Sequence, residues 1–189
     1  MKRSTVVERT THDTKIKIEA NLDGTGKYDI KTGIGFFDHM LEQMARNGFL
    51  DLSVQCTGDL KSDTHHTIEN VGISLGMAFS LALGNKEGIS RYGFKIVPMD
   101  ESLALCAVDF SGRPFLGFNV PFTVPRLGDF DTETIEEFFR AFTVYAGCTL
   151  HIKMISGGNN HHMAEAVFKA AGQAISQAIA IDPRISVKI

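Results

Sequence analysis

The sequence predicts a mixed α/β protein of the α+β type, in which two half-domains, each a small β-sheet with two helices, pack into one unit. Three observations predict this class. Segments with strand-like alternation are interspersed with longer segments of helical periodicity. The same order of segments occurs twice, which indicates an internal duplication. Each copy also contains a His-His-x-x-Glu sequence, in residues 65–69 and again 96 positions later in residues 161–165.

The first copy begins with alternating apolar residues, such as Ile16 and Ile18 among lysines, which are typical of strands. Gly48 ends the first helix, and Asp63 or Thr64 is the predicted N-cap of the second. The predicted segments are strands within residues 1–30 around a turn at Asp23-Gly24, a helix over 33–47, a strand over 49–56 and a helix over 64–83.

The second copy repeats this order, and its middle strand is apolar enough to be buried on both faces. Asp131 or Thr132 is the predicted cap of its first helix, and Gly147 ends that helix. We place the boundary between the copies near Tyr92, so that the half-domains are residues 1–92 and 93–189. The predicted segments are strands over 91–100, 102–110 and 113–122, a helix over 131–147, a strand over 148–155 and a helix over 161–180 closed by Asp182-Pro183.

The composition argues against several classes of function. Of 189 residues, 43% are hydrophobic, and the net charge of −3 includes no basic block that would attract nucleic acid or an anionic membrane. The longest apolar stretch, residues 71–83, is too short to span a bilayer. Three separated cysteines without a C-x-x-C motif predict buried free thiols. No apolar run follows the charged first residues, so we expect no signal peptide and a cytoplasmic location.

The paired histidines predict that each helix serves two metal ions. His65 and Glu69 are four residues apart and share one face of a helix, whereas His66 is rotated by about 100° and faces elsewhere. Residues 161–165 repeat this layout. A single His-His pair is more often a surface feature than a ligand pair, but the recurrence of both pairs with glutamate at the same offset favours metal binding.

Two such helices can form two metal sites by exchanging one histidine. His39 and Glu137 occupy matching places in the preceding helices and are the expected fourth ligands. Imidazole and carboxylate ligands without thiolate suit Mn, Fe, Zn or Ni. His12 and His151 lack such neighbours, and His151 alternates with apolar residues, which predicts a structural role. The expected ligand sets are His65, Glu69 and His162 at one site, and His161, Glu165 and His66 at the other.

Motifs along nearly the whole chain resemble those of the imidazoleglycerol-phosphate dehydratase family. The matching segments are RTTHDT, TGIGFFDHML, SDTHHTIENVGISLG, RYG, PMDESL, DFSGRPFL, EEFFRAF, LHI, GGNNHHMAEAVFKA and DPR, in the order of the family. The resemblance implies the fold called ribosomal protein S5 domain 2-like. It also implies two Mn²⁺ ions and a homo-oligomer of twenty-four copies with active sites at subunit interfaces.

The resemblance further implies the dehydration of D-erythro-imidazole-glycerol phosphate to imidazole-acetol phosphate in histidine biosynthesis. In the implied reaction the imidazole ring loses its N–H and expels the neighbouring hydroxyl, and loss of a side-chain proton then yields an enol that becomes the ketone. The implied metal ligands are His39, His65, His66, Glu69, Glu137, His161, His162 and Glu165. Many relatives carry histidine at the position of Glu137.

The other implied roles concern catalysis and substrate binding. Glu165 is the expected acid/base carboxylate, with His66 and Asp13 as further catalytic residues; the family usually has glutamate at the position of Asp13. The expected substrate-binding residues are Asp13, His39, His65, Glu69, Arg91, Arg113 and Lys169, of which the two arginines and the lysine match phosphate-binding positions.

The sequence ends at DPRISVKI, where relatives continue with a Pro-Ser-Ser-Lys-Gly segment that closes over the phosphate. On this basis we expect metal binding to persist and turnover of the chain as given to be poor. Two other functions are consistent with the residues. One is a dinuclear phosphate-ester hydrolase, against which the lack of an Asp-rich bridging motif counts. The other is a metal-storage or structural assembly.

Overall fold

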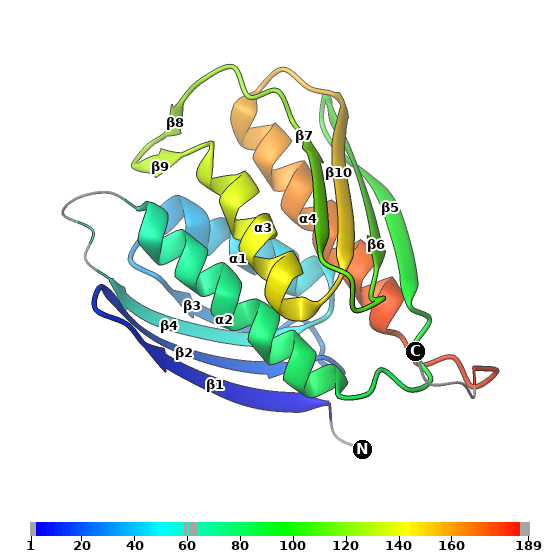
Figure 1. Cartoon of the computed structure of the whole chain (residues 1–189). Helices are drawn as coiled ribbons and strands as arrows, with labels where there is room; N and C mark the ends of the chain where they lie inside the picture. Colours follow the sequence, from blue (N-terminus) through cyan, green and yellow to red (C-terminus); the bar gives the residue numbers. More distant parts are fainter. Residues whose placement is uncertain (1–2, 59, 61–63, 186–189) are drawn as a thin grey trace.

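Two four-stranded sheets enclose a layer of four helices in the computed structural model, which describes residues 3–58, 60 and 64–185 (Figure 1). The first sheet has the order β1-β2-β4-β3 and the second β5-β6-β10-β7. The strands of the first sheet are β1 Ser4–Thr10, β2 Thr14–Asn21, β3 Tyr28–Lys31 and β4 Asp51–Gly58. Those of the second are β5 Tyr92–Met99, β6 Ser102–Asp109, β7 Phe115–Asn119 and β10 Thr149–Ser156. The helices are α1 Gly35–Asn47, α2 His65–Leu83, α3 Thr134–Ala146 and α4 Asn160–Ile179.

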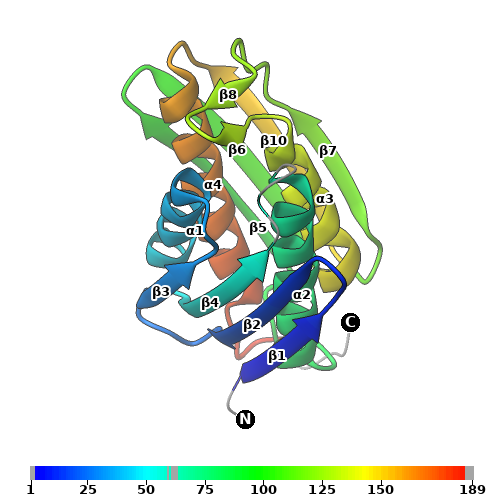
Figure 2. The ribbon, with the colours of Figure 1, turned by 90° about the vertical axis from the view of Figure 1, so that its left-hand side faces the viewer.

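The two sheets have the same topology, which confirms the predicted duplication (Figure 2). In the first, β2 pairs antiparallel with both β1 and β4, while β3 and β4 are parallel. In the second, β6 pairs antiparallel with both β5 and β10, while β7 and β10 are parallel. A parallel pair requires a long crossover, and α1 and α3 lie within the two crossovers. The division at residue 92 stays a prediction.

The buried positions of α1 and α3 also correspond. Met40 and Leu41 of α1 are fully buried, as are Phe138 and Phe139, which lie 98 positions later on α3. The same offset relates β4 to β10, where Val54 and Ile152 face the core. Each helix therefore places its apolar face toward the shared interior, as its 3.6-residue period requires.

The helices contact each other across the two halves, and glycines allow their backbones to approach closely. α1 packs on α4, and α2 packs on α3. A Cβ atom on Gly172 of α4 would lie 2.3 Å from the carbonyl oxygen of Met44 on α1. A Cβ atom on Gly76 of α2 would lie 2.7 Å from the carbonyl oxygen of Phe142 on α3. These two contacts occupy equivalent positions in the repeats, so the same crossing is formed twice.

The helix starts differ in part from the expected ones. Thr64 is at the N-cap position of α2 but forms no side-chain capping bond, and Asp63 lies outside the described residues. The expectation that Asp131 or Thr132 caps α3 is wrong, because the N-cap residue is Glu133. The α4 helix is capped by Asn159, whose side chain accepts hydrogen bonds from two backbone N–H groups.

A short hairpin that the sequence analysis missed explains the different start of α3. Strands β8 Arg126–Leu127 and β9 Phe130–Asp131 pair antiparallel just before the helix. Asp131 receives a 2.6 Å hydrogen bond from Arg126, and the Thr132 hydroxyl donates to the Val124 carbonyl at 2.9 Å. Both candidate cap side chains are thus engaged by the hairpin rather than by the helix N-terminus.

The three cysteines are free thiols. Burial raises the pKa of Cys56 to about 11 and that of Cys148 to about 12, and it also raises the pKa of Cys106. A thiol with a raised pKa holds little reactive thiolate at neutral pH. None of the described helices combines the length and apolarity required to cross a membrane.

The close helix crossings lead to a stability prediction. Gly172→Ala places a methyl group within 2.3 Å of a backbone oxygen, which the neighbouring helix can relieve only by moving. Overpacking costs about 1–3 kcal/mol, against which alanine regains about 1 kcal/mol of helix propensity. We expect a lower thermal midpoint by circular dichroism. Gly35→Ala, where the added Cβ meets nothing within 4 Å, is the control; a Gly172→Ala midpoint equal to that of the control contradicts the crossing geometry.

Candidate metal centre

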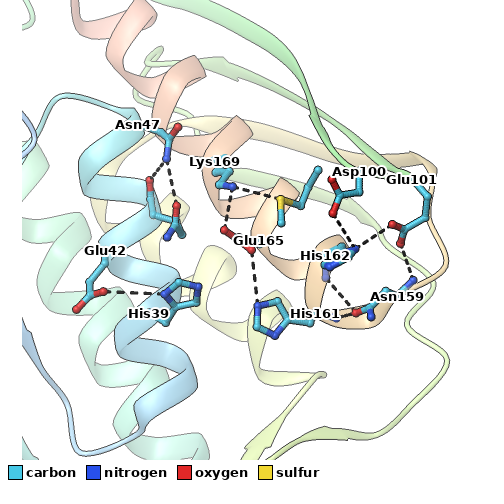
Figure 3. Close-up of polar contacts among 12 residues, drawn as sticks. His39, Glu42, Asn47, Asp100, Glu101, Asn159, His161, His162, Glu165 and Lys169 are labelled. Atoms are coloured by element: carbon cyan, nitrogen blue, oxygen red, sulfur yellow. Dashed lines mark hydrogen bonds and ion pairs between the residues drawn. The ribbon is translucent and has the colours of Figure 1, made fainter.

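His39, His161 and Glu165 form a cluster where the N-terminal halves of α1 and α4 meet (Figure 3). One potential ligand atom from each residue lies within 4.8 Å of the others. His161 Nε2 is 3.6 Å from a Glu165 carboxylate oxygen, and the His39 and His161 rings are 5.9 Å apart. The Glu165 side chain is only 9% exposed. The cluster therefore combines two imidazoles with one nearly buried carboxylate.

The buried charge of Glu165 is balanced by Lys169, one turn further along α4. Lys169 Nζ donates to Glu165 Oε1 at 2.8 Å and also contacts the Met99 sulfur at 3.4 Å. A carboxylate at this depth requires such a partner, since an unpaired buried charge is strongly destabilising. The structure thus places Lys169, an expected phosphate ligand, directly against the expected acid/base residue.

His162 belongs to a second cluster on another side of α4, together with Asp100 and Glu101. Its Nδ1 is 2.9 Å from Glu101 Oε2 and 3.8 Å from an Asp100 oxygen. The hydrogen bond lowers the pKa of Glu101 to about 2 and raises the pKa of His162. The His161 and His162 rings are 85° apart in orientation and face different neighbours, as the helical period predicts.

The donor chemistry of the first cluster fits a divalent metal ion. Two imidazole nitrogens and a carboxylate oxygen suit Mn, Fe, Zn or Ni, and no cysteine belongs to the set. A hollow of about 510 Å³ lies beside His39 and His161, bordered by residues 127–130 of the β8–β9 hairpin. Space for a small molecule therefore adjoins the ligand-type side chains.

The other expected ligands do not join this cluster within one chain. The two clusters of three ligand-type side chains in the described part of the chain contain none of His65, His66, Glu69 and Glu137. Glu137 instead lies 3.6 Å from Arg140. The structure does not bring His162 to His65 and Glu69. The reason is the helix pairing, since α2 packs on α3 and α4 on α1.

The expected phosphate-binding arginines lie at the other end of α4. Arg91 forms two hydrogen bonds with Asp109, at 2.7 and 3.2 Å, and its backbone N–H bonds to the carbonyl of Ala178. Ala178 lies seventeen positions after His161 on the same helix, which corresponds to about 25 Å at 1.5 Å per residue. Arg113 lies beside Thr149, at the start of β10. Since α4 follows the end of β10, Arg113 is at the opposite end of this strand from the first residues of α4.

Asp13 and Glu101 occupy equivalent positions in the two repeats. Asp13 directly precedes β2 and Glu101 directly precedes β6, and each of these strands pairs with two neighbours. Asp13 is 3.8 Å from His12, and its side chain is 52% exposed. The sequence analysis predicted a role for Asp13 but not for Glu101 or Asn159, although Glu101 lies within the PMDESL motif. The duplication itself was the signal that could have found Glu101.

Fold and site together define a duplicated α/β protein with a His/Glu cluster suited to a divalent metal. The family model described as imidazoleglycerol-phosphate dehydratase matches residues 32–175. Similar proteins with that name include one from Clostridium acetobutylicum, 56% identical over 97% of this chain and 93% of the relative. One from Polynucleobacter necessarius is 55% identical over 97% and 94%. The chain belongs to the imidazoleglycerol-phosphate dehydratase family, a family of hydro-lyases.

Solved structures agree with this assignment. The imidazoleglycerol-phosphate dehydratase of Staphylococcus aureus is 38% identical and superposes with a TM-score of 0.86, covering 95% of this chain and 99% of that one. The enzyme of Pyrococcus furiosus, solved in complex with (S)-C348, is 34% identical with a TM-score of 0.83, covering 96% and 97%. The predicted fold class is confirmed.

The cluster leads to a prediction about metal affinity. His161→Ala removes one of the two imidazoles of the cluster. We expect the affinity for Mn²⁺ at this site to fall by about 100-fold or more, since loss of even an outer partner costs about 10–100-fold. Titration of metal-stripped protein with Mn²⁺ measures this. His151→Ala removes an exposed strand histidine that joins neither cluster, so equal losses in both variants contradict the assignment.

Proposed function

We propose that the chain is a Mn²⁺-dependent dehydratase that converts D-erythro-imidazole-glycerol phosphate to imidazole-acetol phosphate and water, in the histidine biosynthesis of the cytoplasm. The observation that carries this proposal is the meeting of His39, His161 and Glu165 in a member of this family. A pair of imidazoles with a buried carboxylate supplies the ligands and the acid/base group that such a reaction needs.

When bound, the divalent ions supply Lewis-acid stabilisation of the negative charge that develops on the imidazole ring of the substrate. The chain supplies the proton transfer. Lys169 holds Oε1 of Glu165, so Oε2, on the side of His161, is the oxygen that accepts a proton from the substrate side chain and returns it. Lys169 has three donors and gives one to Glu165, so it can also hold a phosphate oxygen of the substrate.

The proposal requires more than one copy of the chain. The site of His39 and His161 lies about 25 Å from Arg91 in the same chain, by the helix rise, and a phosphate ester of a short side chain does not span that distance. We propose that copies assemble, as a 24-mer, so that the arginines and the ligand group of α2 from other copies complete each site. His65, His66, Glu69, Glu137 and Asp13 keep their proposed roles in this assembly.

The outer faces of the two sheets indicate which surface is suited to contact between copies. They occupy the same place in the duplicated fold but differ in chemistry. Along β2 the outward residues are Lys15, Lys17 and Glu19, and at the equivalent positions of β6 they are Leu103, Leu105 and Ala107. Phe94 and Phe115, on flanking strands of the second sheet, are 66% and 56% exposed. Large exposed apolar patches mark interaction sites, so the second sheet is the expected contact face.

An assay of the products tests the proposed reaction against its rivals. Metal-stripped protein reloaded with Mn²⁺ under anaerobic conditions is incubated with imidazole-glycerol phosphate. We expect a ketone product, detected by enolate absorbance in alkali, without release of inorganic phosphate. Release of inorganic phosphate would indicate the hydrolase. If neither product forms, a metal-storage or structural assembly is the remaining function. Glu165→Gln, which removes the acid/base group and keeps its size, should lose most of the turnover.

Complementation between variants tests the shared site. Arg113→Ala changes an exposed loop residue, and His161→Ala changes the cluster. Each variant alone should have little activity. Chains of the two variants, co-expressed, should regain part of the activity, because some sites then combine an intact cluster with an intact arginine.

A chain that carries both changes is the control. Co-expressed with Arg113→Ala chains it should show no recovery, since no copy then supplies the arginine. Absence of recovery in the first mixture, with mixed assemblies shown by mass spectrometry, contradicts a site shared between copies.

A further inference from the structure

The carboxylate of Glu101 binds three groups from three segments, and Figure 3 shows two of these contacts, those with His162 and Asn159. Its Oε2 is 2.9 Å from His162 Nδ1. Its Oε1 accepts the backbone N–H of Asn159 at 2.8 Å and the hydroxyl of Ser102 at 3.1 Å. The carboxylate thereby ties the turn between β5 and β6 to the loop before α4 and to the first turn of that helix.

The contact with His162 selects one tautomer of the imidazole. A glutamate is ionised at neutral pH and then only accepts hydrogen bonds. The Nδ1 atom of His162 must therefore carry the proton and donate it to Glu101. In the neutral ring the other nitrogen, Nε2, is left with its lone pair, which is the form that a metal ligand requires.

We propose that Glu101 is a positioning residue, which holds His162 with Nδ1 protonated and directs Nε2 toward a divalent metal ion. This inference rests on the proposed function, since it assumes that His162 is a metal ligand. Metal-binding histidines commonly donate their second ring N–H to a carboxylate in this way. Glu101 touches neither the cluster of His39 nor the substrate hollow beside it, so it acts through the imidazole.

A comparison with the neighbouring Asp100 separates the effect of the hydrogen bond between Glu101 and His162 from the effect of a nearby negative charge. Asp100 carries the same charge and lies 3.8 Å from the same nitrogen, beyond hydrogen-bond distance, with its side chain 73% exposed. Only Glu101 is connected to the loop before α4, through Asn159.

Substitution of Glu101 by glutamine should force the wrong tautomer. The amide oxygen replaces Oε1 as the acceptor for the Asn159 N–H, so the amide NH₂ faces His162 Nδ1. That nitrogen must then accept, and the proton moves to Nε2. We expect Glu101→Gln to lower the binding affinity for one Mn²⁺ ion by about 10–100-fold, the range for loss of a hydrogen-bond partner of a metal ligand. Glu101→Ala, which leaves the ring free to choose its tautomer, should weaken it less.

Titration of metal-stripped protein with Mn²⁺, followed by the electron paramagnetic resonance signal of free Mn²⁺, measures these affinities without an activity assay. Asp100→Asn is the matched control, since it removes one charge beside His162 and no hydrogen bond to Nδ1; its affinity should equal that of the wild type. Circular dichroism verifies that each variant is folded.

Any of three results overturns the inference while the proposed function stands. Glu101→Gln binds Mn²⁺ as tightly as the wild type does, or Asp100→Asn loses as much affinity as Glu101→Gln. The third is that Glu101→Ala loses more affinity than Glu101→Gln. The last order is the one that a purely structural role predicts, because glutamine keeps the bond to Asn159 and alanine does not. Wild-type protein that binds no Mn²⁺ overturns the proposed metal dependence, and the inference with it.

Discussion

The backbone contact between α1 and α4 is the constraint on which the site depends. Gly172 meets the carbonyl of Met44 at a distance that leaves no room for a side chain. His39 lies N-terminal to this crossing on one helix, and His161 and Glu165 lie N-terminal to it on the other. Because the two helices approach closely at this point, their N-terminal halves also lie near each other, and residues from distant parts of the sequence share one small volume.

The duplication repeats this frame, but the side chains on it differ. Gly76 meets the Phe142 carbonyl as Gly172 meets that of Met44, so Glu137 occupies the place of His39. It lies near Arg140 instead of joining a three-residue cluster of the described part of the chain. The outward residues of β2 are charged, whereas those at the equivalent positions of β6 are apolar. The same architecture thus carries different side chains in its two halves.

The charges of the site are arranged in layers around the ligand-type residues. The charge of Glu165 is balanced by Lys169, one turn further along α4. The ring of His162 contacts the carboxylate of Glu101, which lies in the turn between β5 and β6. The cap Asn159 accepts from the backbone N–H groups of His161 and His162 and donates its own to Glu101. The position of both histidines therefore depends on a loop whose polar groups are mutually bonded, and a polar network of this kind specifies a single geometry.

By itself the sequence determined the order of the helices and of the strands in the two four-stranded sheets, the duplication, and His39, His161, His162 and Glu165 as ligand-type residues, because periodicity and turn chemistry act over a few neighbouring positions. It also determined that His161 and His162 face different directions, since that follows from the period of one helix. Only the tertiary structure decided that His39 meets His161, that Glu101 holds His162, that the β8–β9 hairpin displaces the start of α3, and that Arg91 lies far from the cluster. These depend on where one helix axis lies relative to another element, and the packing of glycines and apolar side chains from distant segments sets that placement.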